Sequence, residues 1–294
     1  MVRGNLLRNG PLWLTASALC FAVMAVAVRI GGSHGIPGSE TTLIRFLFGL
    51  ATVGILHSSG AAKVVIRRIP LLAARGIFGG IAILLYFLSL SAAKGPGATS
   101  LTNGVFLGNS YFIYVPLIGA LLIGERLCMS TAIAVISALG GLFLVAHPNL
   151  AHMRAGDTYG FLAGITSALA IVIIRELRKT EPAVAIFLSL CAFGSLVALF
   201  GMALEKPIWP NAMGWAILVL MGITSTIGQL LMTYALKFTP AGEAGIIQMT
   251  TVIYSSLAGV LWFGDPFNAR IAIGALIVLA SAAYISLRTQ DVCE

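Results

Sequence analysis

The chain has 294 residues, of which 59% are hydrophobic and only 10% are charged, so it has too little polar surface for a soluble domain of this length. Its formal net charge is +8. The basic residues are spread over short loops rather than gathered on one face. This distribution argues against nucleic-acid binding and matches the charge pattern that orients membrane proteins.

Ten apolar stretches, each long enough to cross a bilayer, fill almost the whole chain. A transmembrane helix needs about 20 apolar residues, so ten of them use about two thirds of the length and leave no room for a soluble domain. Proline and glycine mark most of the breaks. We therefore predict an all-α integral membrane fold of ten transmembrane helices. The predicted spans are residues 11–31, 39–57, 71–93, 98–123, 129–147, 157–174, 183–204, 211–236, 241–263 and 267–287.

The first apolar run, which starts at Pro11, is full length and lacks a convincing signal-peptide cleavage site, so we expect it to be the first span. The four cysteines are scattered and show no paired spacing, so neither a disulfide framework nor a zinc site is expected. They are Cys20, Cys128, Cys191 and Cys293. We expect no cofactor and no bound metal.

The orientation follows from counting Lys and Arg on alternate sides of the spans. Twelve lie on one side: Arg3, Arg8, Lys63, Arg67, Arg68, Arg75, Arg126, Arg175, Arg178, Lys179, Lys237 and Arg288. Five lie on the other: Arg29, Lys94, Arg154, Lys206 and Arg270. The excess predicts a multi-pass protein of the cell (inner) membrane with both termini in the cytoplasm.

The fourth and ninth spans echo each other at a constant offset of 140 residues. The offset pairs Tyr114 with Tyr254, Gly119 with Gly259, Gly124 with Gly264, and Glu125 with Asp265. We interpret residues 1–150 and 151–294 as two five-helix repeats. Because five is odd, the second repeat enters the membrane from the opposite side, an architecture typical of secondary transporters. Shared low-complexity membrane sequence is the alternative.

Several short motifs resemble the EamA-type members of the drug/metabolite transporter superfamily. Gly124-Glu125-Arg126 ends an apolar span with Pro116 some turns earlier, and Gly264-Asp265 repeats the ending in the ninth span. Arg45-Phe46 lies early in the second span, and Arg75-Gly76 opens the third. Together with the two five-span halves, these motifs cover nearly the whole chain.

The chain also departs from the family pattern. Asp265-Pro266 stands where a Glu-Arg pair is usual, Ser256 stands where Pro116 predicts a proline, and Arg45 has no counterpart in the seventh span. The resemblance implies a ten-helix transporter of small organic solutes and does not fix the solute.

Polar groups inside the membrane are costly, so each is a candidate for function. In the fourth span Asn103, Ser110 and Tyr114 share one helix face, and adding 140 gives Glu243, Thr250 and Tyr254. We predict that these two stripes face each other across a central cavity. Ser110, Tyr114, Thr250 and Tyr254 then contact the solute, while Asn103 and Glu243 lie nearer the two mouths. Helix–helix hydrogen bonding is the alternative.

Arg45 and Glu243 point to different solutes. Arg45 in a cavity favours a carboxylate or another anionic group, although pairing with Glu40 or snorkelling to the outer surface explains it equally well. Glu243 favours a cationic group or a proton site. Its alternative role is that of an acid in the first turn of a helix, where the dipole favours negative charge.

Three further side chains are candidate solute contacts. Gln229 in the eighth span and Gln248 in the ninth suit a solute with both donors and acceptors, and Tyr86 supplies an aromatic wall. Packing roles are equally compatible with each of them.

The predicted function is a secondary carrier that moves an amphipathic metabolite, similar to an amino acid or a nucleoside, by alternating access. An organic-anion carrier that uses Arg45 and a channel stay open as alternatives. A membrane-embedded enzyme is disfavoured because all four histidines lie at span edges or in loops and no hydrolase motif is present. The expected partners are a small-molecule solute and bilayer lipid, with no nucleic acid. Coupling to protons or another ion and assembly as a homodimer are left open.

Overall fold

The structure, a computed structural model, describes residues 9–60, 64–92, 101–124, 129–146, 154–203, 205, 207–263 and 269–288. Within these ranges it contains twelve helices and no strand, which confirms the all-α class. The helices are α2 (Gly10–Ser33), α3 (Gly38–Ser58), α4 (Ile69–Ser91), α5 (Leu101–Gly108), α6 (Tyr111–Ile123), α7 (Met129–Ala146), α8 (Ala155–Leu177), α9 (Ala183–Met202), α10 (Ala212–Ala235), α11 (Ala241–Gln248), α12 (Thr250–Phe263) and α13 (Ala269–Arg288).

Seven helical stretches of the described chain are long and apolar enough to cross a membrane. They comprise α2, α3, α4, α8, α9, α10 and the stretch Glu243–Phe263 that runs through most of α11 and all of α12. Shorter apolar stretches occur in α7 and α13, at Ala132–Gly141 and Ala269–Tyr284. The chain is therefore a multi-pass membrane protein.

Two of the predicted spans consist of two helices each. The span predicted at 98–123 is divided into α5 and α6 by Asn109 and Ser110, and the span at 241–263 is divided into α11 and α12 by Met249. Asn109 explains the first break, because its side-chain amide donates to the Val105 carbonyl at 2.8 Å. Asparagine side chains that bond the local backbone compete with helix continuation.

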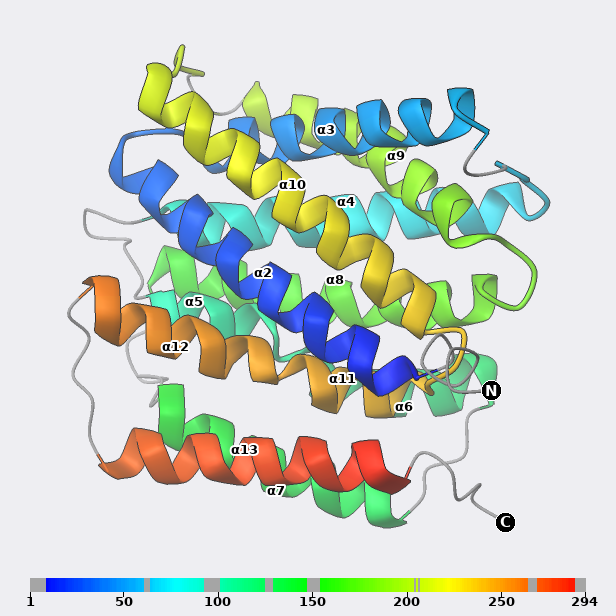
Figure 1. Ribbon diagram of the computed structural model, residues 1–294, viewed down its shortest axis with the longest axis vertical. Helices are drawn as coiled ribbons and strands as arrows, with labels where there is room; N and C mark the ends of the chain where they lie inside the picture. Colours follow the sequence, from blue (N-terminus) through cyan, green and yellow to red (C-terminus); the bar gives the residue numbers. More distant parts are fainter. Residues whose placement is uncertain are drawn as a thin grey trace.

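The helices form a layered bundle in which distant segments of the chain pair (Figure 1). α2 packs on α10, α4 packs on α8, α3 packs on α9, and α7 packs on α13. The pair of α7 and α13 lies at one end of the stack of helices, and α3 with α9 lies at the other. α2, α4 and α8 run between them. α4 contacts α9 at one end, while α5, α11 and α12 provide contacts to α7 or α13 at the other.

Glycine allows α4 and α9 to approach closely. A Cβ added to Gly80 would lie 2.8 Å from the Cα of Gly194, so no larger residue fits at that crossing. Close approach through small residues is how membrane helices gain packing contacts in lipid.

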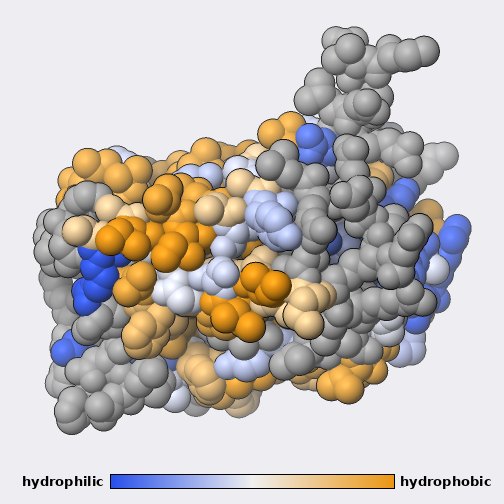
Figure 2. All heavy atoms as spheres, turned by 90° about the horizontal axis from the view of Figure 1, so that it is seen from below, coloured by the Kyte–Doolittle hydropathy of each residue, from blue (hydrophilic) through white to orange (hydrophobic). Residues whose placement is uncertain are grey.

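Large apolar side chains remain on the outside, as a lipid-facing surface requires. Leu121, Phe200 and Trp262 are each more than half exposed. Figure 2 shows one face of the molecule, with apolar side chains predominating across its middle and strongly hydrophilic residues near its two ends.

Candidate solute-binding cavity

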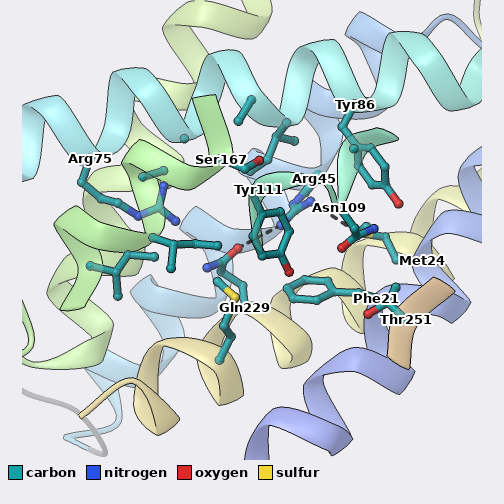
Figure 3. Close-up of a pocket in the computed structure, with 18 residues that line it drawn as sticks. Phe21, Met24, Arg45, Arg75, Tyr86, Asn109, Tyr111, Ser167, Gln229 and Thr251 are labelled. Atoms are coloured by element: carbon teal, nitrogen blue, oxygen red, sulfur yellow. Dashed lines mark hydrogen bonds between the residues drawn. The ribbon is translucent and has the colours of Figure 1, made fainter. Parts of the chain in front are cut away.

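A cavity of about 100 Å³ lies in the middle of the bundle, between helices from both parts of the chain (Figure 3). Its walls come from α2, α3, α4, the α5–α6 break, α8, α10 and α12. Drug-sized ligands occupy pockets of about 300–1,000 Å³, so the cavity is narrow in this conformation and suits a small solute. Its polar lining residues are Arg45, Arg75, Tyr86, Asn109, Tyr111, Ser167, Gln229 and Thr251.

Arg45 reaches the cavity from the second turn of α3 and is 4% exposed. Its Nη2 donates to Oε1 of Gln229 at 3.3 Å, and its Nη1 lies 3.3 Å from the sulfur of Met24, a weak acceptor. The guanidinium also lies 5.5 Å from the centre of the Phe87 ring, within cation–π range. Arg45 and Gln229, each named from the sequence as a candidate solute contact, are thus in direct contact with one another.

The pairing of Arg45 with Glu40, considered from the sequence, is not what the structure shows. Glu40 Oε2 instead accepts a hydrogen bond from the backbone N–H of Ile208 at 3.0 Å, while Arg45 is bonded to Gln229. Arg45 is therefore buried next to the cavity without a carboxylate partner among the described residues.

Arg75 is a second buried arginine that the sequence argument did not place in the site. It was counted among the basic residues at the ends of the spans, but in the structure it lies in the second turn of α4 and is 3% exposed. Its Nε has no hydrogen-bond partner in the described part of the chain. Without Arg75, the count of basic residues is eleven on one side and five on the other, so the predicted orientation is unchanged. Its position inside the predicted span 71–93 is the sequence feature that could have identified Arg75 as a buried arginine.

The break between α5 and α6 delivers Asn109 and Tyr111 to the cavity. Tyr86 of α4 lies beside them, because the edge of its ring packs on Gly108: a Cβ there would meet Tyr86 Cδ2 at 2.3 Å. Thr251 of α12, which stands 140 residues after Tyr111, lines the opposite wall. Of the ten residues proposed from the sequence, the cavity lining contains three, Arg45, Tyr86 and Gln229.

The predicted stripes of α6 and α12 lie one residue away from the cavity-lining positions. Ser110 is buried against α8, where a Cβ on Gly164 would come within 2.2 Å of its Oγ, and its hydroxyl has no hydrogen-bond partner among the described residues. Tyr114 packs on the hydrophobic core, and Thr250 donates to the carbonyl of Ile247 at 2.8 Å. None of these three side chains lines the cavity in this conformation, so their contact with solute stays a prediction.

The remaining candidates lie in three other places. Tyr254 lines an apolar groove formed by α2, α10 and α12. Gln248 is buried and donates to Ser17 Oγ at 3.0 Å, which joins α11 to α2. Glu243 occupies the first turn of α11, the position that the alternative of a helix-start acid requires. Asn103 belongs to α5, but its side chain lies outside the part that the structure describes.

These observations define a polytopic helical membrane protein with a narrow cavity inside its bundle, into which several polar side chains reach. Comparison with known proteins shows which family the chain resembles. Residues 154–287 match the EamA-like transporter family. The whole chain is similar to a crystal structure of a protein with a TM-score of 0.76 and 18% sequence identity, covering 97% of this chain and 98% of the other, which shows that the fold is shared.

Full-length relatives are also transporters. An uncharacterized transporter of Helicobacter pylori is 27% identical over 96% of each chain. The pseudopaline exporter CntI of Pseudomonas aeruginosa is 24% identical over 95% of this chain and 96% of its own. Mouse solute carrier family 35 member G1 is 21% identical over 95% of this chain and 78% of its own. These matches support membership of the drug/metabolite transporter superfamily and a role in membrane transport.

Proposed function

We propose that the protein is a secondary carrier that moves a small amphipathic metabolite of amino-acid size, bearing at least one anionic group, by alternating access. The observation that carries this proposal is a cavity in the middle of the bundle that contains a buried arginine hydrogen-bonded to a buried glutamine. Polar groups at this depth are costly and commonly mark a solute pathway. The cavity supports the anion alternative drawn from Arg45 and has less room for a nucleoside.

The proposal includes two inverted five-helix repeats, residues 1–150 and 151–294. Two features support them. α5 and α11 are both eight residues long, and the bounds 101–108 and 241–248 differ by the same offset of 140. The packing of α2 on α10 has a counterpart in the packing of α4 on α8, as it must if α2, α4, α8 and α10 exchange roles between repeats. Discontinuous helices that line a central site are typical of such carriers.

We propose further that the protein lies in the cell (inner) membrane with both termini in the cytoplasm, as the excess of basic residues indicates. CntI is named as an exporter, which makes export the direction to test first for this chain. Coupling to protons or to another ion, and assembly as a homodimer, are further parts of the proposal that need measurement. We expect no enzymatic activity.

The test begins with a thermal-shift screen of the purified full chain against a metabolite library, because a ligand of the folded state raises the melting midpoint. Each hit is then assayed for counterflow in proteoliposomes, where unlabelled solute inside drives transient accumulation of labelled solute from outside. A carrier shows this accumulation. Flux without counterflow would identify a channel and overturn the carrier mechanism.

A matched pair of neighbouring positions on α8 tests whether the central cavity is the route. Ser167 lines the cavity, whereas Thr166 does not and bonds to the carbonyl of Leu162 in its own helix at 2.9 Å. Ser167→Leu fills a narrow cavity and should abolish counterflow, while Thr166→Leu should leave it intact. Equal activity of the two variants would place the route elsewhere.

A further inference from the structure

The second buried arginine of the cavity identifies the class of solute more narrowly. We propose that the transported solute carries two anionic groups and that Arg45 and Arg75 each bind one of them. This inference rests on the proposed carrier function and names the substrate class of the same cavity. Figure 3 shows the two guanidinium groups entering the cavity from α3 and α4, with the ring of Tyr111 between them in this view.

Charge balance is the first argument. Arg45 is 4% exposed and Arg75 is 3% exposed, and the cavity lining of the described chain contains no Asp or Glu. Two like charges in one low-dielectric cavity repel each other and lose their hydration. A solute with one anionic group leaves one arginine uncompensated. A dianion gives each arginine an opposite charge, so its binding offsets the repulsion and part of the cost of the lost hydration.

The described carboxylates are engaged elsewhere in the fold. Glu40 and Glu205 accept backbone N–H groups of Ile208 and Ser39, each at 3.0 Å, at the outer end of α3 by the predicted orientation. Glu181 accepts the backbone N–H groups of Arg67 and Arg68 at the opposite end of the bundle. Each of these acids secures a loop near a helix end, and neither arginine of the cavity is bonded to one of them.

Unused hydrogen-bond donors are the second argument. A guanidinium presents five N–H donors in a fork that fits a carboxylate in a bidentate pair. Among the described residues, the hydrogen-bond partners of Arg45 are a glutamine oxygen at 3.3 Å and a thioether sulfur, and Arg75 Nε has no hydrogen-bond partner. Both groups can therefore form stronger hydrogen bonds with an arriving carboxylate or phosphate oxygen than with their present surroundings.

The positions of the two arginines set the shape of the solute. Arg45 lies in the second turn of α3, and Arg75 lies in the second turn of α4. These helices are consecutive and antiparallel, so their second turns lie toward opposite ends of the bundle (Figure 1). We infer that the two side chains approach the cavity from opposite sides. The solute that satisfies both carries its anionic groups at its two ends, with an apolar middle beside Ile171 and Met232.

The experiment uses a thermal-shift titration of the full chain with the sodium salts of malonate, succinate, glutarate and adipate at constant ionic strength. The monoamide and the diamide of each diacid are the matched probes, because they keep the length and lose one or both charges. We expect one or more of the diacids to raise the melting midpoint. Its monoamide should need a concentration higher by about tenfold or more for the same shift.

Charge-removing variants assign the preference to the two arginines. Arg45→Gln and Arg75→Gln should each make the diacid and its monoamide equally effective. Arg68→Gln removes the same charge from an ion pair with Glu176, outside the cavity, and should retain the preference. The titration of the unaltered protein tests the proposal even where a variant does not fold.

Three results would overturn the two-anion proposal: equal shifts by diacid and monoamide, no shift by any diacid, or a preference that persists in both cavity variants. These results differ from a failure of the carrier proposal. Counterflow of a neutral or singly charged solute would leave the carrier mechanism standing and refute only the second anionic group.

Discussion

The Arg45 guanidinium donates a hydrogen bond to the side-chain oxygen of Gln229 across 3.3 Å, and this bond joins α3 to α10 in the middle of the membrane protein. The two residues are 184 positions apart in the chain. Gln229 in turn donates to Thr233 at 3.5 Å, one turn further along α10. The bond thus connects the two parts of the chain at the point where solute is expected to bind.

Replacing Gln229 with glutamate should separate stability from binding. Gln229→Glu keeps the side-chain volume and gives Arg45 a carboxylate partner, so we expect an unchanged or higher melting midpoint. The same carboxylate occupies the guanidinium and repels an anionic solute, so the shift produced by the diacid series should fall by about tenfold or more in apparent affinity. Gln229→Leu, in contrast, leaves Arg45 without its amide partner and should destabilise the protein by about 1–3 kcal/mol. Full anion binding by Gln229→Glu would contradict the role given to Arg45.

The crossing of α8 with α5 and α6 depends on Gly164. A Cβ at this position would lie 2.2 Å from Ser110 Oγ and 2.8 Å from the Leu107 carbonyl oxygen, which is backbone and cannot turn away. Gly164→Ala should therefore lower the free energy of unfolding by about 1–3 kcal/mol, the usual cost of overpacking. Gly54→Ala is the control, because no atom lies within 4 Å of its added Cβ. Reversible unfolding in mixed micelles measures both, and equal effects would contradict the tight crossing.

Much of the fold follows from hydrophobic length and punctuation. Long apolar stretches bounded by proline or glycine predicted helices close to those observed, such as 71–93 for α4 at Ile69–Ser91 and 183–204 for α9 at Ala183–Met202. The breaks inside the fourth and ninth spans were not predicted, because neither Asn109 nor Met249 is a proline or a glycine and apolar residues continue on both sides of each. Only the local side-chain bond of Asn109 to Val105 shows why the first break occurs.

The candidate site differs most from the cavity lining around those breaks. Ser110 and Tyr114 were expected on the face that carries Asn103, whereas Tyr111 of α6 lines the cavity and Ser110 packs on α8. In α12 the cavity-lining residue is Thr251, next to the predicted Thr250. Arg45 and Gln229 were chosen as candidates because they are a charge and an amide inside apolar spans, and both line the cavity.

Ser17 connects three helices through its hydroxyl. It accepts a hydrogen bond from Gln248 Nε2 at 3.0 Å and donates to the Gly228 carbonyl at 2.8 Å, so α2 is bonded to α11 and α10. Ser17→Ala removes both bonds and should destabilise the protein by about 1–2 kcal/mol. Thr166→Ala removes a hydrogen bond within a single helix, so it should destabilise the protein much less than Ser17→Ala does.

A double-mutant cycle checks the Ser17 prediction. Gln248→Leu and Ser17→Ala should give less than additive losses in unfolding free energy, because each removes the same bond. Additive losses would show that the hydrogen bond seen in the structure contributes nothing measurable.

Two acidic residues secure opposite ends of the bundle in equivalent ways. Glu40, in the first turn of α3, accepts the backbone N–H of Ile208 at 3.0 Å and fastens the segment that leads into α10. Glu181, just before α9, accepts those of Arg67 and Arg68 at 2.9 Å and fastens the segment that leads into α4. If the protein works by alternating access, these contacts close the cavity from opposite sides, and removing them should shift the equilibrium in opposite directions.

The shift can be measured with a cysteine introduced at Ser167 in a chain whose four native cysteines are replaced by serine. Membrane-impermeant maleimide is added to right-side-out or to inside-out vesicles. Glu40→Ala should increase labelling from the side on which Ile208 lies, and Glu181→Ala should increase it from the side of Arg67. Asp157→Ala is the control, because the Asp157 carboxylate accepts the backbone N–H of Arg154, at the start of its own helix, at 3.0 Å. Because the population of each form depends on the difference between the two contacts, a shift of both variants toward the same side would show that they do not act as opposing closures.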